Sequence, residues 1–226
     1  YIALRKIPPQ NVVYLDWKGN REAILGRAFR GRILMPILKE IDERRLGSQI
    51  DYIVFSSDFP WMVNLQNLFP EEKLGPPFDP VASLTGATYL TPFVVGQSSA
   101  IVVPDSNWYV PGPTAANLMS CTALENVPSR GFRSRYLWDK NGQRTQKDTE
   151  GQRYLLSTML GVTSGRGNTV PEVICYLHRA ASADGTRPRG TIYYMANQGT
   201  RSQARDKCFE AVAAQIQKLG VRATVQ

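Results

Sequence analysis

The side chains best placed to bind a ligand follow four apolar runs that read as β-strands. Each group stands just after its run, where a strand of a parallel sheet would end. The carboxyl ends of parallel strands meet at one edge of a sheet, and α/β proteins place their ligands at that edge. We therefore predict one ligand-binding rim, formed by Asp16, Ser57, Asp58, Thr163, Ser164, Gly165, Arg166, Gly167, Asn168 and Asn197.

The turn 163–168 carries the sharpest of these signals. Its glycines let backbone N–H groups face outward, the helix that follows adds a positive dipole, and Arg166 adds a fixed charge. Such a turn could hold a phosphate, a sulfate or a carboxylate. It matches neither the dinucleotide GxGxxG nor the Walker lysine motif. The more common role of such glycines is to form a tight strand-to-helix turn.

The residues offer no complete catalytic set. Ser57 beside Asp58 could be a nucleophile and its acidic partner, but a hydroxyl needs a base, and the single histidine, His178, falls inside an expected helix. The cysteines are far apart and form no CxxC or Cys/His cluster, so we predict no metal site and no cofactor. We interpret Cys175 and Cys208 as packing residues on apolar helix faces.

The formal charge of +8 suits an anionic partner. Much of the excess lies in 129–153, which holds seven basic and three acidic residues with three interleaved aromatic side chains. Such a mixture can bind phosphates and stack bases, but nothing here forms a known nucleic-acid module. The more common alternative is a solvated hairpin that turns at 139–142. We predict a basic patch of Arg130, Arg133 and Arg135.

Strands that alternate with amphipathic helices predict an α/β fold with a mostly parallel sheet, flanking helices and right-handed crossovers. A capping box of Thr169 and Glu172 should begin one helix, and Pro36 should kink another, which should end at Gly47. The expected strands are 12–16, which should pair in parallel with 50–56, and 152–160, 190–195 and 221–225; the expected helices are 21–46, 170–183 and 202–219.

We expect one α/β domain over 1–226 with a Pro/Gly-rich, irregular insertion at 57–151. Within that insertion, a helix over 79–90 and a strand over 100–103 are expected. The chain starts with what reads as the last turns of a helix and ends on a strand without a turn, so we expect it to be cut from a longer protein at both ends. No apolar run is long enough to predict a transmembrane segment.

Four segments support a comparison with a known family: Tyr1 with Arg5-Lys6-Ile7-Pro8 and Asn11-Val12-Val13, the strand 51–55, the segment 153–161, and 190–194. These residues resemble an uncharacterised bacterial family of often exported α/β proteins, whose N-terminal half is similar to caspase-like and gingipain-like peptidases. The resemblance implies a three-layer sandwich of the caspase-like or flavodoxin-like kind, and export or a place in the cell envelope. No catalytic residue is established for the family, so none is carried over. The His and Cys that a caspase-like protease needs at its strand ends are missing from the expected strand ends.

Three functions follow from these observations. The preferred hypothesis is a non-catalytic binding or structural module of the cell envelope, with a protein partner or a second copy of the chain as its partner. The alternative is a hydrolase with its site at the carboxyl ends of the strands and part of that site beyond Gln226. A weaker alternative is an anion or nucleic-acid binder that uses the basic patch and Arg166. Steep salt dependence of binding would favour the last of these.

Overall fold

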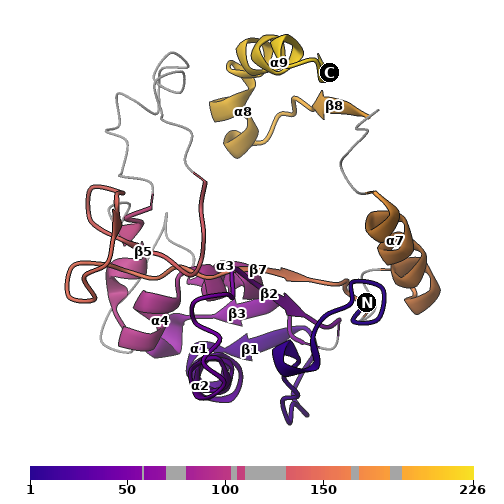
Figure 1. The fold of residues 1–226 in the computed structure, drawn as a ribbon. Coiled ribbons are helices and arrows are strands. Elements are labelled where there is room, and N and C mark those ends of the chain that lie inside the picture. Colours follow the sequence, from indigo (N-terminus) through magenta and orange to yellow (C-terminus); the bar gives the residue numbers. More distant parts are fainter. Residues whose placement is uncertain (58, 70–79, 103–105, 110–130, 164–167, 184–189) are drawn as a thin grey trace. The chain divides into compact units, whose positions relative to one another are not determined.

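The computed structural model describes residues 1–57, 59–69, 80–102, 106–109, 131–163, 168–183 and 190–226. The chain divides into two units, and both contain helices and strands (Figure 1). Unit 1 comprises Tyr1–Gly112 and Phe132–Ala181, and unit 2 comprises Pro113–Gly131 and Ser182–Gln226. The prediction of a single domain over 1–226 stays a prediction.

One long helical stretch lies in unit 1. It follows strand β1 (Ala23–Leu25) and consists of α1 (Gly26–Phe29), a π-helical segment (Arg30–Leu34) and α2 (Met35–Glu43). Pro36 lies in the first turn of α2, where it lacks an N–H and its ring crowds the carbonyl one turn earlier. The wider π-helical turn just before it lets the helix continue through this proline. Most of the predicted helix over 21–46 is confirmed, but its first residues form β1.

The helix α2 ends at Glu43, three residues before the predicted end, and its terminating turn comes two residues earlier than predicted. Arg45, rather than Gly47, adopts the left-handed conformation, with φ of 54°. The Leu46 N–H then donates to the Ile41 carbonyl at 2.8 Å, as in a Schellman motif. Leu46 is buried against the core. We attribute the position of the helix end to the burial of Leu46, because the left-handed turn before it is formed by an arginine and not by a glycine.

The strands of unit 1 pair differently from the predicted order. β1 pairs in parallel with β3 (Met62–Asn64), and β3 pairs antiparallel with β4 (Val81–Ser83). β2 (Tyr52–Phe55) pairs in parallel with β7 (Leu156–Met159). Residues 12–16 form no strand, so the predicted parallel pair of 12–16 with 50–56 is wrong. Helices and strands in parallel and mixed sheets, with helices beside them, make this an α/β fold.

Much of the described part of 57–151 is regular and belongs to the core. Besides β3 and β4, it contains short helices whose buried side chains pack with those of the long helical stretch. The expected helix over 79–90 is shorter, and the expected strand over 100–103 is wrong, because its described residues are 3₁₀-helical. The elements are the 3₁₀ turn Gln66–Leu68, α3 (Leu84–Tyr89), α4 (Thr91–Gly96) and the 3₁₀ turn Ser99–Val102; another 3₁₀ turn, Pro9–Asn11, lies near the N-terminus.

The helix α7 (Val170–Ser182) begins with the predicted capping box. The Thr169 N–H donates to a Glu172 carboxylate oxygen at 2.7 Å, and the Glu172 N–H donates to the Thr169 hydroxyl at 3.4 Å. The hydrogen bond from the Thr169 backbone, followed by that from its hydroxyl, lowers the pKa of Glu172. Just before α7, a Cβ on Gly161 would lie 2.8 Å from a methyl group of Val173, so only glycine lets the chain pass so close to the helix.

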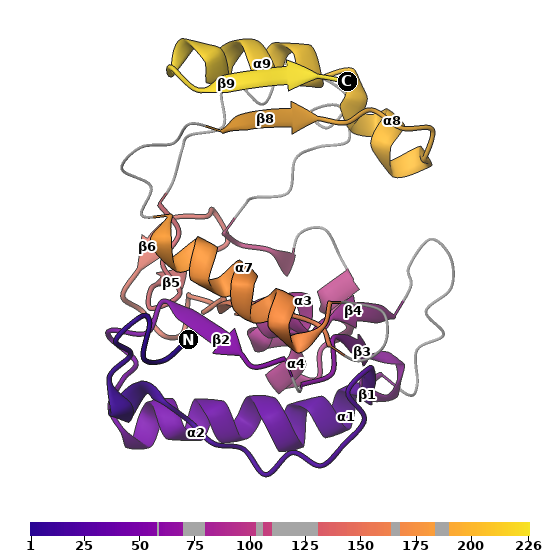
Figure 2. The same ribbon diagram turned by 90° about the vertical axis from the view of Figure 1, so that its right-hand side faces the viewer.

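Unit 2 has its own parallel strand pair. β8 (Thr191–Tyr194) lies beside β9 (Arg222–Val225), and α9 (Phe209–Lys218) runs along β9 (Figure 2). The rings of Tyr194 and Phe209 meet at 5.3 Å and join the helix to the sheet. The strands predicted at 190–195 and 221–225 are confirmed. The helix predicted over 202–219 is two helices, because α8 (Thr200–Asp206) ends before Cys208.

The cysteines differ from their predicted role as packing residues. Cys175 is a free and exposed thiol on α7, and Cys208 is disulfide-bonded. The third cysteine, Cys121, lies outside the described residues. No helix among the residues that the structure describes is long and apolar enough to cross a membrane.

We expect a thiol reagent to separate the two described cysteines. In denaturant without a reductant, it should modify Cys175 and leave Cys208 unmodified, because a disulfide sulfur carries no thiolate. After reduction, peptide mass spectrometry should find Cys208 modified as well. The variant Cys175→Ser controls for the free thiol. Modification of Cys208 before reduction would contradict the disulfide.

Candidate functional site: an arginine cluster before two parallel strands

Part of the predicted rim comes together in unit 1. β2 and β7 are parallel neighbours, and the Leu160 N–H donates to the Phe55 carbonyl at 3.0 Å just where both strands end. The segments that carry Ser57 and Thr163 therefore leave the sheet at the same edge. Asp58 and residues 164–167, which are Ser164, Gly165, Arg166 and Gly167, lie outside the described residues. A ligand-binding role for this edge stays a prediction.

Three other residues of the predicted rim are described, namely Asp16, Asn168 and Asn197. Asp16 follows no strand, and its carboxylate lies 3.5 Å from Lys18 Nζ with both side chains almost fully exposed. Asn168 is exposed just before α7. Asn197 belongs to unit 2, where its side-chain oxygen accepts from the Gly199 N–H at 2.8 Å. This is an Asx turn that leads into α8. The placement of Asp16 at a strand end is thus wrong.

The basic patch forms a defined cluster at the opposite end of β2 and β7. Arg133 Nη1 lies 3.5 Å from Asp51 Oδ2, and Arg135 Nε lies 3.7 Å from the same oxygen. The Arg135 backbone N–H lies 3.4 Å from Asp51 Oδ1. Asp51 immediately precedes β2, so these arginines gather where the strand begins. Arg130 lies outside the described residues.

Ser134 fixes the arginine segment to the strands. Its hydroxyl accepts from the Leu156 N–H in β7 at 2.8 Å, and its carbonyl accepts from Arg153 Nε at 2.8 Å. Arg153 also donates to the Gly47 carbonyl at 3.1 Å. Burial lowers the pKa of Arg153, while the charge of Asp51 opposes that shift. Because Ser134 is buried, its two neighbours, Arg133 and Arg135, are held at the surface.

A third arginine joins the cluster from a hairpin. β5 (Leu137–Trp138) pairs antiparallel with β6 (Arg144–Thr145), and the turn between them is the predicted one, with two backbone N–H groups on the Asp139 carboxylate. Arg144 Cζ lies 3.5 Å from the centroid of the Tyr136 ring, and Arg135 Cζ lies 5.6 Å from it. Two guanidinium groups therefore share one aromatic ring, in cation–π contacts that hold them near each other.

A cluster of buried and partly buried aromatic side chains lies beneath this surface. Phe132 and Trp138 stack at 5.6 Å, and Tyr109 meets both rings edge-on. Trp138 is only 4% exposed, so it cannot stack on a base. Of the three aromatic residues interleaved with the basic ones, Tyr136 is the one whose ring makes cation–π contacts with the described arginines. Tyr89, Phe93 and Tyr154 complete this aromatic cluster.

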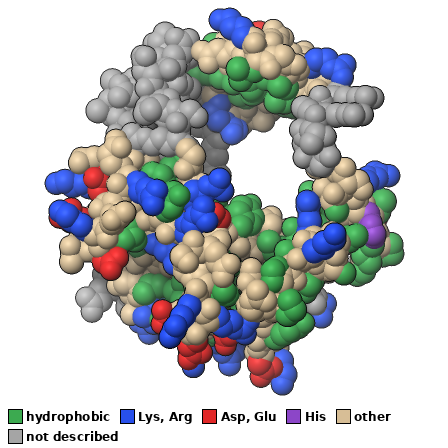
Figure 3. Space-filling view, in the orientation of Figure 1, with side chains coloured by type: hydrophobic (Ala, Val, Ile, Leu, Met, Phe, Trp, Pro, Cys, Tyr) green, Lys and Arg blue, Asp and Glu red, His purple; other side chains and the backbone are tan. Residues whose placement is uncertain are grey.

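The resulting surface is suited to an anionic group. Lys and Arg side chains are prominent on the part of unit 1 around β5 (Figure 3). Two surface arginines, Arg133 and Arg135, share the Asp51 carboxylate, and a third, Arg144, shares the Tyr136 ring with Arg135. Guanidinium groups bind phosphate, sulfate and carboxylate oxygens through paired N–H donors. The arrangement can therefore hold an oxyanion.

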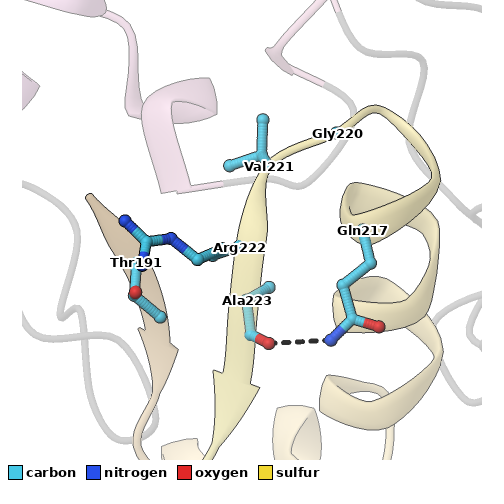
Figure 4. Close-up of a pocket in the computed structure, with 6 residues that line it drawn as sticks. All are labelled: Thr191, Gln217, Gly220, Val221, Arg222 and Ala223. Atoms are coloured by element: carbon cyan, nitrogen blue, oxygen red, sulfur yellow. Dashed lines mark hydrogen bonds between the residues drawn. The ribbon is translucent and has the colours of Figure 1, made fainter. Parts of the chain in front are cut away.

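A separate feature of unit 2 is a cavity. An open cavity of about 490 Å³ is lined by the start of both strands and the end of α9 (Figure 4). The Gln217 side-chain amide donates to the Ala223 carbonyl at 2.8 Å across its wall. The cavity lies at the amino ends of β8 and β9, whereas Asn197 follows the carboxyl end of β8. None of the predicted site residues that the structure describes lines this cavity.

Sequence reasoning found Arg133 and Arg135 but missed Asp51 and Ser134 as parts of the site. The rule that ligands bind at the carboxyl ends of strands directed attention to the other end of β2 and β7. The available signal was that Asp51 and Arg153 are each the second residue of an expected strand, 50–56 and 152–160, so a parallel pair would bring them together.

No protein family, curated protein or solved structure matches this chain. Among the described residues, no group of three or more His, Cys, Asp or Glu could hold a metal ion.

Proposed function

We propose that this chain is a non-catalytic binding module whose arginine cluster holds an oxyanion of its partner. The single observation that carries the proposal is the convergence of Arg133 and Arg135 on Asp51, with Arg144 held over Tyr136 beside them. The three guanidinium groups exceed the one carboxylate by two charges. The buried Ser134 and the aromatic cluster hold the segment in place, so ligand binding costs little ordering of the backbone.

A place in the cell envelope is part of the same proposal. The resemblance to an often exported bacterial family supports it, and so does the disulfide at Cys208, because disulfides persist mainly in oxidising compartments. We further propose a caspase-like three-layer sandwich as the complete fold. The parallel pairs β1–β3, β2–β7 and β8–β9 support that proposal, with β4 as an antiparallel addition to the sheet of β1 and β3.

Titration of the full chain with inorganic tripolyphosphate tests the proposal. We expect the double variant Arg133→Gln/Arg135→Gln to bind about tenfold more weakly and to show a shallower dependence of affinity on salt, because two charge-assisted contacts are lost. The matched control is Lys18→Gln/Lys39→Gln, which removes the same charge from two exposed sites. An equal loss in both double variants, or no binding by the native chain, would contradict the proposal.

Two alternatives have their own readouts. Binding of a single-stranded oligonucleotide in preference to tripolyphosphate would favour the nucleic-acid function. The hydrolase alternative rests on the shared edge beyond β2 and β7, where Ser57 lies. A serine-directed fluorophosphonate that modifies Ser57 would favour it.

A further inference from the structure

Asp51 is the one carboxylate in contact with the arginine cluster among the described residues. Its side chain is 24% exposed, and the charged groups that face it are Arg133, Arg135 and Arg153. The Arg135 backbone N–H faces it as well. The carboxylate therefore occupies the position that a bound anion would take between Arg133 and Arg135.

The contacts between Asp51 and the two guanidinium groups are long. They measure 3.5 Å and 3.7 Å, whereas a tight charge-assisted hydrogen bond measures about 2.7–2.9 Å. Both guanidinium groups approach the same oxygen, so neither forms a bidentate pair with the carboxylate. The Arg133 side chain is more than half exposed. Neither group therefore gives up a tight or bidentate ion pair when it turns toward another anion.

Asp51 keeps other partners when the arginines turn away. The Arg135 backbone N–H and the charge of Arg153 remain beside the carboxylate. Arg153 is itself held by the carbonyls of Ser134 and Gly47, so it does not follow the ligand. Release of Arg133 and Arg135 thus leaves no buried charge without compensation.

From this geometry we propose that Asp51 is an internal competitor that lowers the affinity of the cluster for its ligand. The inference rests on the proposed function and concerns the regulation of the same site. An incoming oxyanion shares the guanidinium groups of Arg133 and Arg135 with Asp51 and is repelled by its charge. Ligands that carry several charges, such as phosphates, therefore bind in preference to single carboxylates.

The variant Asp51→Asn tests the inference. Asparagine keeps an oxygen that can accept from the Arg135 N–H but removes the charge. We expect it to bind inorganic tripolyphosphate about fivefold more tightly than the native chain and to discriminate less between tripolyphosphate and acetate. The matched control, Glu150→Gln, removes an exposed carboxylate that pairs with Lys147 and should raise affinity less than twofold. Unchanged or weaker binding by Asp51→Asn would overturn the inference and make Asp51 an orienting residue.

A second measurement uses the native chain and needs no variant to fold. NMR signals of the arginine Nε–H groups and of the Asp51 carboxylate carbon should shift together as tripolyphosphate is added. Arginine signals that shift while the Asp51 signal stays unchanged would overturn competition but keep the proposed function. If no signal shifts and Asp51→Asn also fails to bind, both proposals are wrong.

Discussion

Replacement of Tyr154 by phenylalanine should lower the free energy of unfolding by about 2–4 kcal/mol. The Tyr154 side chain is fully buried, donates to the Ser106 carbonyl at 2.8 Å and accepts from the Trp108 N–H at 2.6 Å. Phenylalanine keeps the ring packing but takes away both bonds, and a buried group that loses its partner costs about 1–3 kcal/mol. Urea unfolding measures the change, and the exposed Tyr14→Phe serves as the control.

The same side chain should make the stability fall at alkaline pH. Burial raises the pKa of Tyr154 from 10.0 to about 12. The folded state therefore favours the neutral phenol. The contribution of Tyr154 to the free energy of unfolding is fully present below pH 10.0 and is lost as the pH rises toward about 12. Tyr154→Phe should unfold with a weaker pH dependence across this interval. An identical dependence in the variant and the native chain would contradict the assignment to Tyr154.

The variant Ser134→Ala should weaken both the fold and the binding of anions. Ser134 is 1% exposed, and its hydroxyl is the acceptor for the Leu156 N–H at the start of β7. Without that acceptor the buried N–H costs about 1–3 kcal/mol. The arginine segment also loses its bond to β7, so we expect the affinity for tripolyphosphate to fall about threefold.

Chemical unfolding and titration measure these two effects of Ser134→Ala separately. The control is Ser48→Ala, because Ser48 is exposed and lies in the turn between α2 and β2. Native affinity in a destabilised Ser134→Ala variant would mean that the aromatic cluster alone positions the arginines. Native stability would mean that another group takes over the Leu156 N–H.

The elements that could be predicted from the sequence depend on short-range chemistry. The capping box of Thr169 and Glu172 and the hairpin turn at Asp139 each need only residues three or four positions apart. The strands β2, β7, β8 and β9 follow from apolar runs between turn residues. The wrong prediction of a strand at 12–16 also came from an apolar run. Such a run does not show whether a neighbouring strand is available to pair with it.

The pairing of the strands and the assembly of the arginine cluster could not be predicted in this way. The sequence by itself determined where most helices and strands form, since hydrogen bonds and side-chain periodicity within a few residues decide that. Only the tertiary structure decided that β1 pairs with β3, and that Arg133 meets Asp51 from 82 residues away. These long-range contacts depend on how all the apolar side chains pack into one core. A local sequence pattern does not contain that information. The arginine cluster lies at the amino ends of β2 and β7 because the buried Ser134 and the aromatic side chains hold its segment there.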